Sequence, residues 1–292
     1  MEGMKRISLS LRIAWLSRFL AGALLLTVPA VAQPSDSNQA RVAALGLGVI
    51  ESARVSVAFS DSVAGEIASG YAAEAIAAAA WYRSELDWQE EMAIAVLDAD
   101  DFRRVTAIPY PSPHAETRTG FIIIADRVDG HPGFGLWDVD ERDINLAWML
   151  HEIGHVIAHD LGIGSANPWV NELIASVIMA GYINAERTQF AGFQSGMPPR
   201  FAGEGNYASL VEFDRLYFAM GQFDYLWFHF HIADLANYVI EETGDLGAAM
   251  ERLGQEFPAG RPPETVDGTL LRLEQIAPGI SALAALLMSA LE

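Results

Sequence analysis

The 292-residue chain contains no cysteine, which excludes disulfide bonds and a lipid-modified cysteine anchor. Lysine is almost absent as well: Lys5 is the only one, and every other basic side chain apart from histidine is arginine. After the first 32 residues, no continuous apolar run is long enough to cross a bilayer. The sequence therefore predicts no stable membrane insertion for the chain that follows residue 32.

Positive charge is scarce overall, with 18 Lys and Arg against 38 Asp and Glu and a formal net charge of −20. Four of these basic residues lie in the first 32 positions, so the remaining chain carries 14 basic and 37 acidic residues. Nucleic acid and anionic lipid both require a basic surface on their partner. The composition thus argues against either of them as a partner.

The first 32 residues have the pattern of an export signal. Four basic residues precede the apolar run FLAGALLLTVPAVA, which ends in Ala30-Val31-Ala32. A basic start, an apolar run and an A-x-A site are typical of a cleaved secretory signal. We expect residues 1–32 to be removed and the mature protein to be periplasmic or extracellular. The alternative is that this segment is kept as an N-terminal anchor.

The chain after the signal changes character near residue 142. Before it, β-branched and apolar runs predict strands at 54–62, 92–98 and 119–127, with helices at 64–86 and 98–107. Beyond it, helices are predicted at 144–160, 168–183, 206–220, 222–243, 245–254 and twice after Pro263. The predicted fold class is α+β. A small mixed sheet with helices lies in residues 33–142, and a mainly helical subdomain follows in residues 143–292.

The segment WMLHEIGHVIAHD, residues 148–160, holds three of the seven histidines. His151 and His155 are four residues apart, which places both imidazoles on one face of a helix, about 5–6 Å apart at Cβ. Two such nitrogens can converge on one Zn²⁺, and the Glu152 carboxylate between them can reach a water molecule. His159 rises too far along the helix to join the same ion, so we expect it at the helix end or behind the ligands.

A catalytic zinc site needs a third protein ligand and an open position. In a metzincin this ligand would be a histidine at position 161, after a glycine at 158, but the chain has Leu161 and Ala158 there. The alternative is a carboxylate on the following helix, for which Asn167 is a suitable N-cap and Pro168 a suitable first residue. Glu172 is an isolated carboxylate on that otherwise apolar helix, where it would be costly without a cation.

HEIGH followed by Asn171-Glu172 resembles the gluzincins, the thermolysin-like and aminopeptidase-like metallopeptidases. The resemblance implies that His151, His155 and Glu172 bind zinc and that Glu152 is the general base. It also implies that residues 119–127 form an edge strand that pairs with the substrate backbone. The spacing departs from the best-known families, because only sixteen residues separate His155 from Glu172.

The resemblance further implies a donor for the oxyanion from the helical part, which in gluzincins is a tyrosine or a histidine. The segment DYLWFHFH offers Tyr225, His229 and His231. His229 falls where the tyrosine of the family lies, Tyr225 is one turn earlier on the same face, and His231 should point elsewhere. His229 and Tyr225 are both kept as candidates, although aromatic side chains at this spacing can also be core residues.

These features together predict an exported zinc metallopeptidase that acts on a peptide or protein substrate. Two alternatives share the same zinc site. One is a different zinc hydrolase on the same fold, and the other is a zinc-bound module that holds peptides without cleaving them. The presence of Glu152 argues against the second, because a binding module has no need of a base.

Overall fold

The computed structural model describes residues 37–289, except for residue 53 and the segments 107–112, 127–140 and 194–208. The expected export signal, residues 1–32, lies outside this part of the chain. Within the described part, no helix has both the length and the apolar character needed to cross a membrane.

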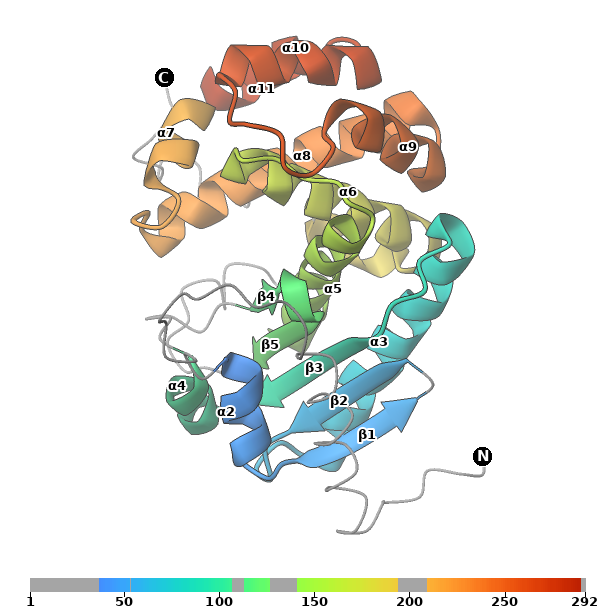
Figure 1. Cartoon of the computed structure of the whole chain (residues 1–292), viewed down its shortest axis with the longest axis vertical. Coiled ribbons are helices and arrows are strands. Elements are labelled where there is room, and N and C mark those ends of the chain that lie inside the picture. Colours follow the sequence, from blue (N-terminus) through green and yellow to red (C-terminus); the bar gives the residue numbers. More distant parts are fainter. Residues whose placement is uncertain (1–36, 53, 107–112, 127–140, 194–208, 290–292) are drawn as a thin grey trace, which may run out of the picture.

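The N-terminal part alternates strands and short or long helices (Figure 1). Its elements are α2 (Asn38–Ala44), β1 (Gly48–Ser52), β2 (Val55–Phe59), α3 (Gly65–Leu86), β3 (Met92–Leu97), α4 (Ala99–Val105), β4 (His114–Glu116), the 3₁₀ helix η2 (Thr117–Thr119) and β5 (Phe121–Ala125). The predicted elements that became β2, α3, β3, α4 and β5 are confirmed. The elements α2, β1 and β4 were not predicted, because they are short and carry little apolar periodicity.

Five strands form one mixed sheet in the order β1-β2-β3-β5-β4. In its middle, β2, β3 and β5 run parallel, and α3 provides the crossover from β2 to β3. At the two edges, β1 and β4 pair antiparallel. Central parallel strands are covered on both faces, and accordingly every residue of β3 and β5 is buried. The predicted α+β class with a small mixed sheet is confirmed.

The strand predicted at residues 119–127 is not the edge strand that the resemblance implied. Its outer side is covered by β4, with Ala115 opposite Ile122. The chain turns between the two strands through η2 and Gly120, which has φ +61° and whose added Cβ would lie 2.9 Å from the carbonyl oxygen of Glu91. This tight turn needs glycine. The turn places β4 at the edge of the sheet, next to helix α5 (Glu141–Asp160), which follows the sheet in the sequence.

Helices cover both faces of this sheet. On one face, α3 contributes small buried residues such as Ala68, Ala72 and Ala75, which allow the helix to pack closely. On the other face, Val42 of α2 and Phe102 of α4 close a smaller apolar cluster. The sheet is therefore the middle layer of a sandwich between helices.

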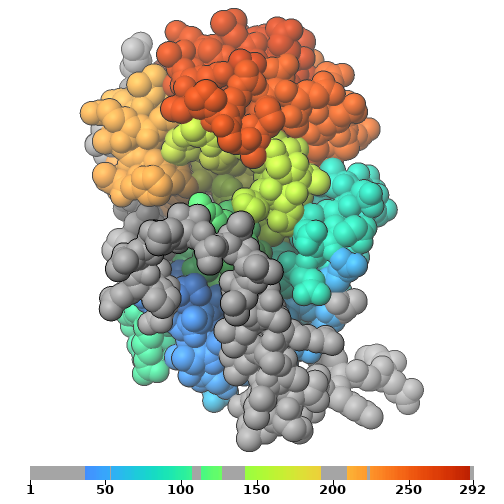
Figure 2. Space-filling model, viewed as in Figure 1, coloured from blue at the N-terminus to red at the C-terminus, as the bar shows by residue number. Residues whose placement is uncertain are grey.

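The C-terminal part contains only helices among its described elements. They are α5 (Glu141–Asp160), α6 (Pro168–Glu186), the 3₁₀ helix η3 (Thr188–Phe193), α7 (Leu210–Leu216), α8 (Gln222–Thr243), α9 (Leu246–Glu256), α10 (Val266–Ile276) and α11 (Ile280–Met288). Most predicted helices match closely, and the helix expected at 206–220 is shorter in the described residues. Figure 2 shows the yellow-green surface of the α5–α6 region between the sheet and the orange and red helices.

One hydrophobic cluster joins the two parts. It runs from Ile94 and Ile122 in the sheet through Ile153 of α5 and Leu173 of α6 to Phe228 of α8. The helix that carries HEIGH therefore lies at the junction, as expected, and it contacts β4, β5, α3 and α6. The core is continuous across residue 142, and the domain boundary proposed there stays a prediction.

Candidate metal centre

Helix α5 presents His151 and His155 on one face, as their spacing predicts. The two imidazole centroids are 4.7 Å apart and the rings are nearly perpendicular. The opposite face of this turn is apolar, with Ile153, Val156 and Ile157 fully buried in the core. The burial of that face fixes the rotation of α5, and the rotation directs both histidines towards α6.

Helices α5 and α6 touch backbone to backbone beside the histidines. A Cβ added to Gly154 would lie 2.5 Å from the carbonyl oxygen and 3.0 Å from the Cα of Ala175. No other amino acid fits at this crossing without moving one of the helices. The glycine in HEIGH thus brings α6 close enough for its side chains to reach the histidines of α5.

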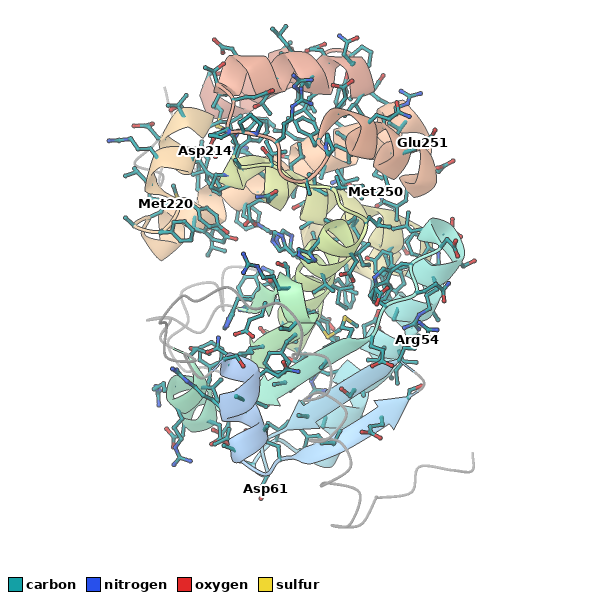
Figure 3. The ribbon with its side chains drawn as sticks, in the orientation of Figure 1. Arg54, Asp61, Asp214, Met220, Met250 and Glu251 are labelled. Carbon is teal, nitrogen blue, oxygen red and sulfur yellow. The ribbon has the colours of Figure 1, made fainter. Side chains whose placement is uncertain are left out.

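Helix α6 begins at Asn167 and Pro168 as predicted, but the cap differs from the expectation. The Asn167 side chain makes no capping hydrogen bond. Instead its Nδ2 donates to Asp214 Oδ2 at 2.7 Å, and Asp214 Oδ1 accepts from the Trp169 backbone N–H at 3.1 Å. The cap of α6 therefore comes from α7, and Figure 3 labels Asp214 between the two helices.

The loop between the two ligand helices is held by Asn171. Its Oδ1 accepts from the Ser165 backbone N–H and its Nδ2 donates to the Ser165 carbonyl, both at 2.8 Å. One amide side chain thus fixes the short connection from α5 to α6. This contact gives the asparagine of the Asn-Glu pair a structural role, and it explains how sixteen residues suffice between His155 and Glu172.

Glu172 meets both histidines in the interior. Its Oε2 lies 3.0 Å from His151 Nε2 and 3.6 Å from His155 Nε2, and the carboxylate side chain is only 2% exposed. One ligand atom from each of the three residues lies within 4.8 Å of the other two. It is the one group of this kind within the described residues. His151, His155 and Glu172 therefore form a buried cluster that could bind a metal ion.

The electrostatics of the cluster suit a cation. Burial alone would raise the pKa of Glu172, but His155 and His151 hold it well below its usual range through charge and hydrogen bonding. Burial would likewise lower the pKa of His155, yet the charge and hydrogen bond of Glu172, with the charge of Glu152, raise it to about 9. The two histidines thus stabilise the charged form of the buried Glu172 carboxylate.

The second imidazole nitrogen of His151 is also engaged. Its Nδ1 lies 3.4 Å from the hydroxyl of Ser176, a fully buried residue one turn after Glu172 on α6. Such a contact orients a histidine whose other nitrogen faces an ion. Both nitrogens of His151 are therefore positioned by the same helix.

Glu152 lies beside the cluster and is not part of it. The residue is 9% exposed, and its charge helps to raise the pKa values of both His155 and Tyr225. No other described residue makes a hydrogen bond to its carboxylate. The carboxylate therefore lies close enough to the cluster to act on it electrostatically.

Comparisons with models of protein families, with curated proteins and with solved structures find no match to this chain. The site must be interpreted from its own geometry.

His229 and Tyr225 of α8 both reach the cluster. The His229 ring is 4.6 Å from that of His151, and the Tyr225 hydroxyl donates to Glu172 Oε2 at 3.0 Å. Burial, with a smaller contribution from His151, lowers the pKa of His229 to about 3. The imidazole of His229 is thus neutral at pH 7. Its Nδ1 is buried without a partner among the described residues.

Tyr217 is a site residue that the sequence analysis missed. Its hydroxyl donates a short hydrogen bond to Glu172 Oε1, while Oε2 is the oxygen that lies 3.0 Å from His151 Nε2. The residue follows α7 directly and is 45 positions from Glu172 in the sequence. Neither motif nor spacing marks it, because the contact depends on how α7 packs on α6.

The remaining histidines of the two segments lie outside the cluster. The His159 side chain is 47% exposed near Asp160 at the end of α5, the position expected for it, and it does not belong to the group of His151, His155 and Glu172. His231 points elsewhere, as expected, and its ring packs edge-on against Trp227 with centroids 4.3 Å apart. Both of its ring nitrogens are buried without a partner among the described residues.

We expect His231 to make the fold sensitive to acid. Burial lowers its pKa to about 4, whereas the unfolded chain binds the same proton near pH 6.5. Stability should therefore fall as the pH decreases from about 6.5 to about 4, by up to about 1.4 kcal/mol per pH unit. His231→Leu should remove this contribution in urea unfolding measured across that range. An unchanged pH dependence in the variant would show that His231 is not the group responsible.

Proposed function

We propose that this chain is an exported zinc metallopeptidase of the gluzincin type. The observation that carries the proposal is the buried cluster of His151, His155 and Glu172 with Glu152 beside it, whose carboxylate accepts no hydrogen bond from a described residue. A buried structural ion pair would not need this second carboxylate at its edge. That pairing of ligands and base is the arrangement that hydrolysis requires.

The donor set favours zinc over the hard cations. Two imidazole nitrogens and one carboxylate oxygen are the protein ligands of many catalytic zinc sites, whereas Ca²⁺ and Mg²⁺ prefer oxygen alone. Zinc in such a site acts as a Lewis acid and lowers the pKa of water towards neutrality. His151 and His155 would hold the ion from α5, and Glu172 would hold it from α6.

The remaining residues of the site would have two roles, transfer of protons and stabilisation of developing negative charge. Glu152 accepts the proton of the attacking water on its carboxylate and later donates it to the leaving nitrogen of the peptide. His229, neutral at pH 7, or Tyr225, whose hydroxyl lies at the cluster and donates to Glu172 Oε2, would donate to the oxygen on which charge develops. Burial keeps the Tyr225 hydroxyl protonated, since its pKa lies well above the usual range.

The first experiment measures zinc stoichiometry of residues 33–292 beside the Glu172→Ala variant. We expect one zinc per chain in the unmodified protein and a much weaker or absent site in the variant. If the unmodified protein binds no zinc when zinc is supplied, the histidines are core residues and the proposal fails. If the variant retains zinc fully, the third ligand has been assigned wrongly.

A peptide library then separates the proposal from its two alternatives. Cleavage of peptide bonds that depends on Glu152 supports the peptidase. Zinc-loaded protein that hydrolyses another class of bond indicates a different hydrolase on the same site. Binding of peptides without cleavage indicates a non-catalytic module.

A further inference from the structure

The two oxygens of the Glu172 carboxylate have different surroundings. Oε2 faces the Nε2 atoms of His151 and His155, at 3.0 and 3.6 Å. Oε1 accepts the short hydrogen bond from the Tyr217 hydroxyl. A carboxylate can bind a metal through one oxygen or through both. The surroundings of Glu172 favour one.

Tyr217 is itself held against α6 from two directions. Three residues earlier, on α7, Asp214 accepts hydrogen bonds from Asn167 and from the Trp169 backbone at the start of α6. The Tyr217 ring packs on Phe213 with centroids 5.4 Å apart and meets Tyr225 edge-on at 6.2 Å. Asp214 thus links α7 to the N-terminus of α6, and Tyr217 links the end of α7 to Glu172 on α6.

We propose that Tyr217 is a positioning residue that makes Glu172 a one-oxygen metal ligand. By donating to Oε1 it keeps that oxygen away from the ion and presents Oε2 beside the two imidazoles. A site with three ligand atoms keeps a position open for a water or a substrate oxygen, which catalysis by zinc requires. The inference rests on the metal site of the proposed function and does not depend on which bond the protein cleaves.

Tyr225 also donates a hydrogen bond to Glu172, but it should affect metal binding differently from Tyr217. Its hydroxyl donates at 3.0 Å to Oε2, the oxygen that the metal would take. Its hydrogen bond therefore competes with the metal for that oxygen. Removal of the Tyr225 hydroxyl should leave metal affinity unchanged or higher, whereas removal of the Tyr217 hydroxyl should lower it.

The test compares Tyr217→Phe, Tyr225→Phe and Tyr182→Phe in the complete chain. Tyr182 is the matched control, because it lies on α6 and its hydroxyl donates to the Glu74 carboxylate at 2.9 Å, away from the cluster. Zinc affinity is measured by competition with a chelator at fixed pH. We expect a loss of about 10–100-fold for Tyr217→Phe, as found for residues that orient a metal ligand, and no loss for the other two variants.

A spectroscopic readout separates positioning from a general effect on folding. With Co²⁺ in place of zinc, release of Oε1 in Tyr217→Phe should let Glu172 bind through both oxygens. The coordination number then rises and the visible absorption bands weaken, while the unmodified protein and Tyr182→Phe keep stronger bands. If Tyr217→Phe fails to fold, Asp214→Ala tests the same positioning, because it frees α7 from α6 and should weaken the Co²⁺ bands.

The inference is overturned if Tyr217→Phe binds zinc as tightly as the unmodified protein, or if Tyr182→Phe loses as much affinity. It is also overturned if the Co²⁺ bands are unchanged. These results are distinct from failure of the proposed function. A chain that binds zinc through Tyr217-supported Glu172 but cleaves no peptide would remove the peptidase proposal and leave this one intact.

Discussion

Replacing Glu152 with glutamine should lower peptide turnover by about 10²–10⁴-fold, the usual contribution of a general acid–base group. The amide has nearly the same shape, but it cannot accept the proton of the attacking water. Glu152 lies beside the metal cluster and no described residue makes a hydrogen bond to its carboxylate. Zinc content should therefore stay at the unmodified level. Initial rates on a cleaved peptide, with metal analysis of the same sample, give both quantities.

The matching control is His159→Gln on the same helix. This residue is half exposed and outside the cluster, so its replacement should change neither turnover nor zinc content. Peptidase activity retained in Glu152→Gln would contradict the assignment of the base. Loss of zinc in Glu152→Gln would instead show that this carboxylate helps to hold the ion.

Replacing Gly154 with alanine should destabilise the fold by about 1–3 kcal/mol or more, the cost of inserting a methyl group into a closed contact. The new Cβ would lie 2.5 Å from a backbone oxygen of α6, which cannot move aside as a side chain can. The helices must separate, and Glu172 then moves away from His151 and His155. Urea unfolding of the metal-free protein and zinc affinity should both show the loss.

Gly70→Ala is the matched control for this prediction. Gly70 lies inside α3, and a Cβ added there meets nothing within 4 Å. Alanine in an exposed helical position normally stabilises by about 0.5–1 kcal/mol relative to glycine. The two substitutions are chemically identical but should act with opposite sign. A Gly154→Ala protein as stable as the unmodified one would show that the two helices are not locked at this crossing.

Long elements with strong apolar patterns could be predicted from the sequence. Helix α8 has the predicted limits, and β3 is a continuous apolar run that is buried on both sides. The three residues of β4, His-Ala-Glu, carry no such pattern, because they form a strand only by pairing with β5. The error about the edge strand follows from this, since an unseen β4 leaves β5 with a free side.

The candidate metal ligands could be predicted for a related reason. His151 and His155 share one helix, so their geometry is local, and Glu172 lies near the start of the next helix after a short loop. Tyr217 and Asp214 could not be predicted, because they act on α6 across more than 40 residues of sequence. Asn171 could be recognised in the sequence only as the neighbour of Glu172. Its hydrogen bonds to Ser165 could not be predicted, because they depend on the conformation of the loop between α5 and α6.

Neighbouring residues of helix α5 face two different environments. His151 and His155 belong to the candidate metal cluster and Glu152 lies beside it, while Ile153, Val156 and Ile157 are fully buried among sheet and helix residues. A shift or rotation of α5 that moved the two histidines would therefore also disturb the packing of these three apolar residues, so the position of the candidate ligands is tied to the stability of the core.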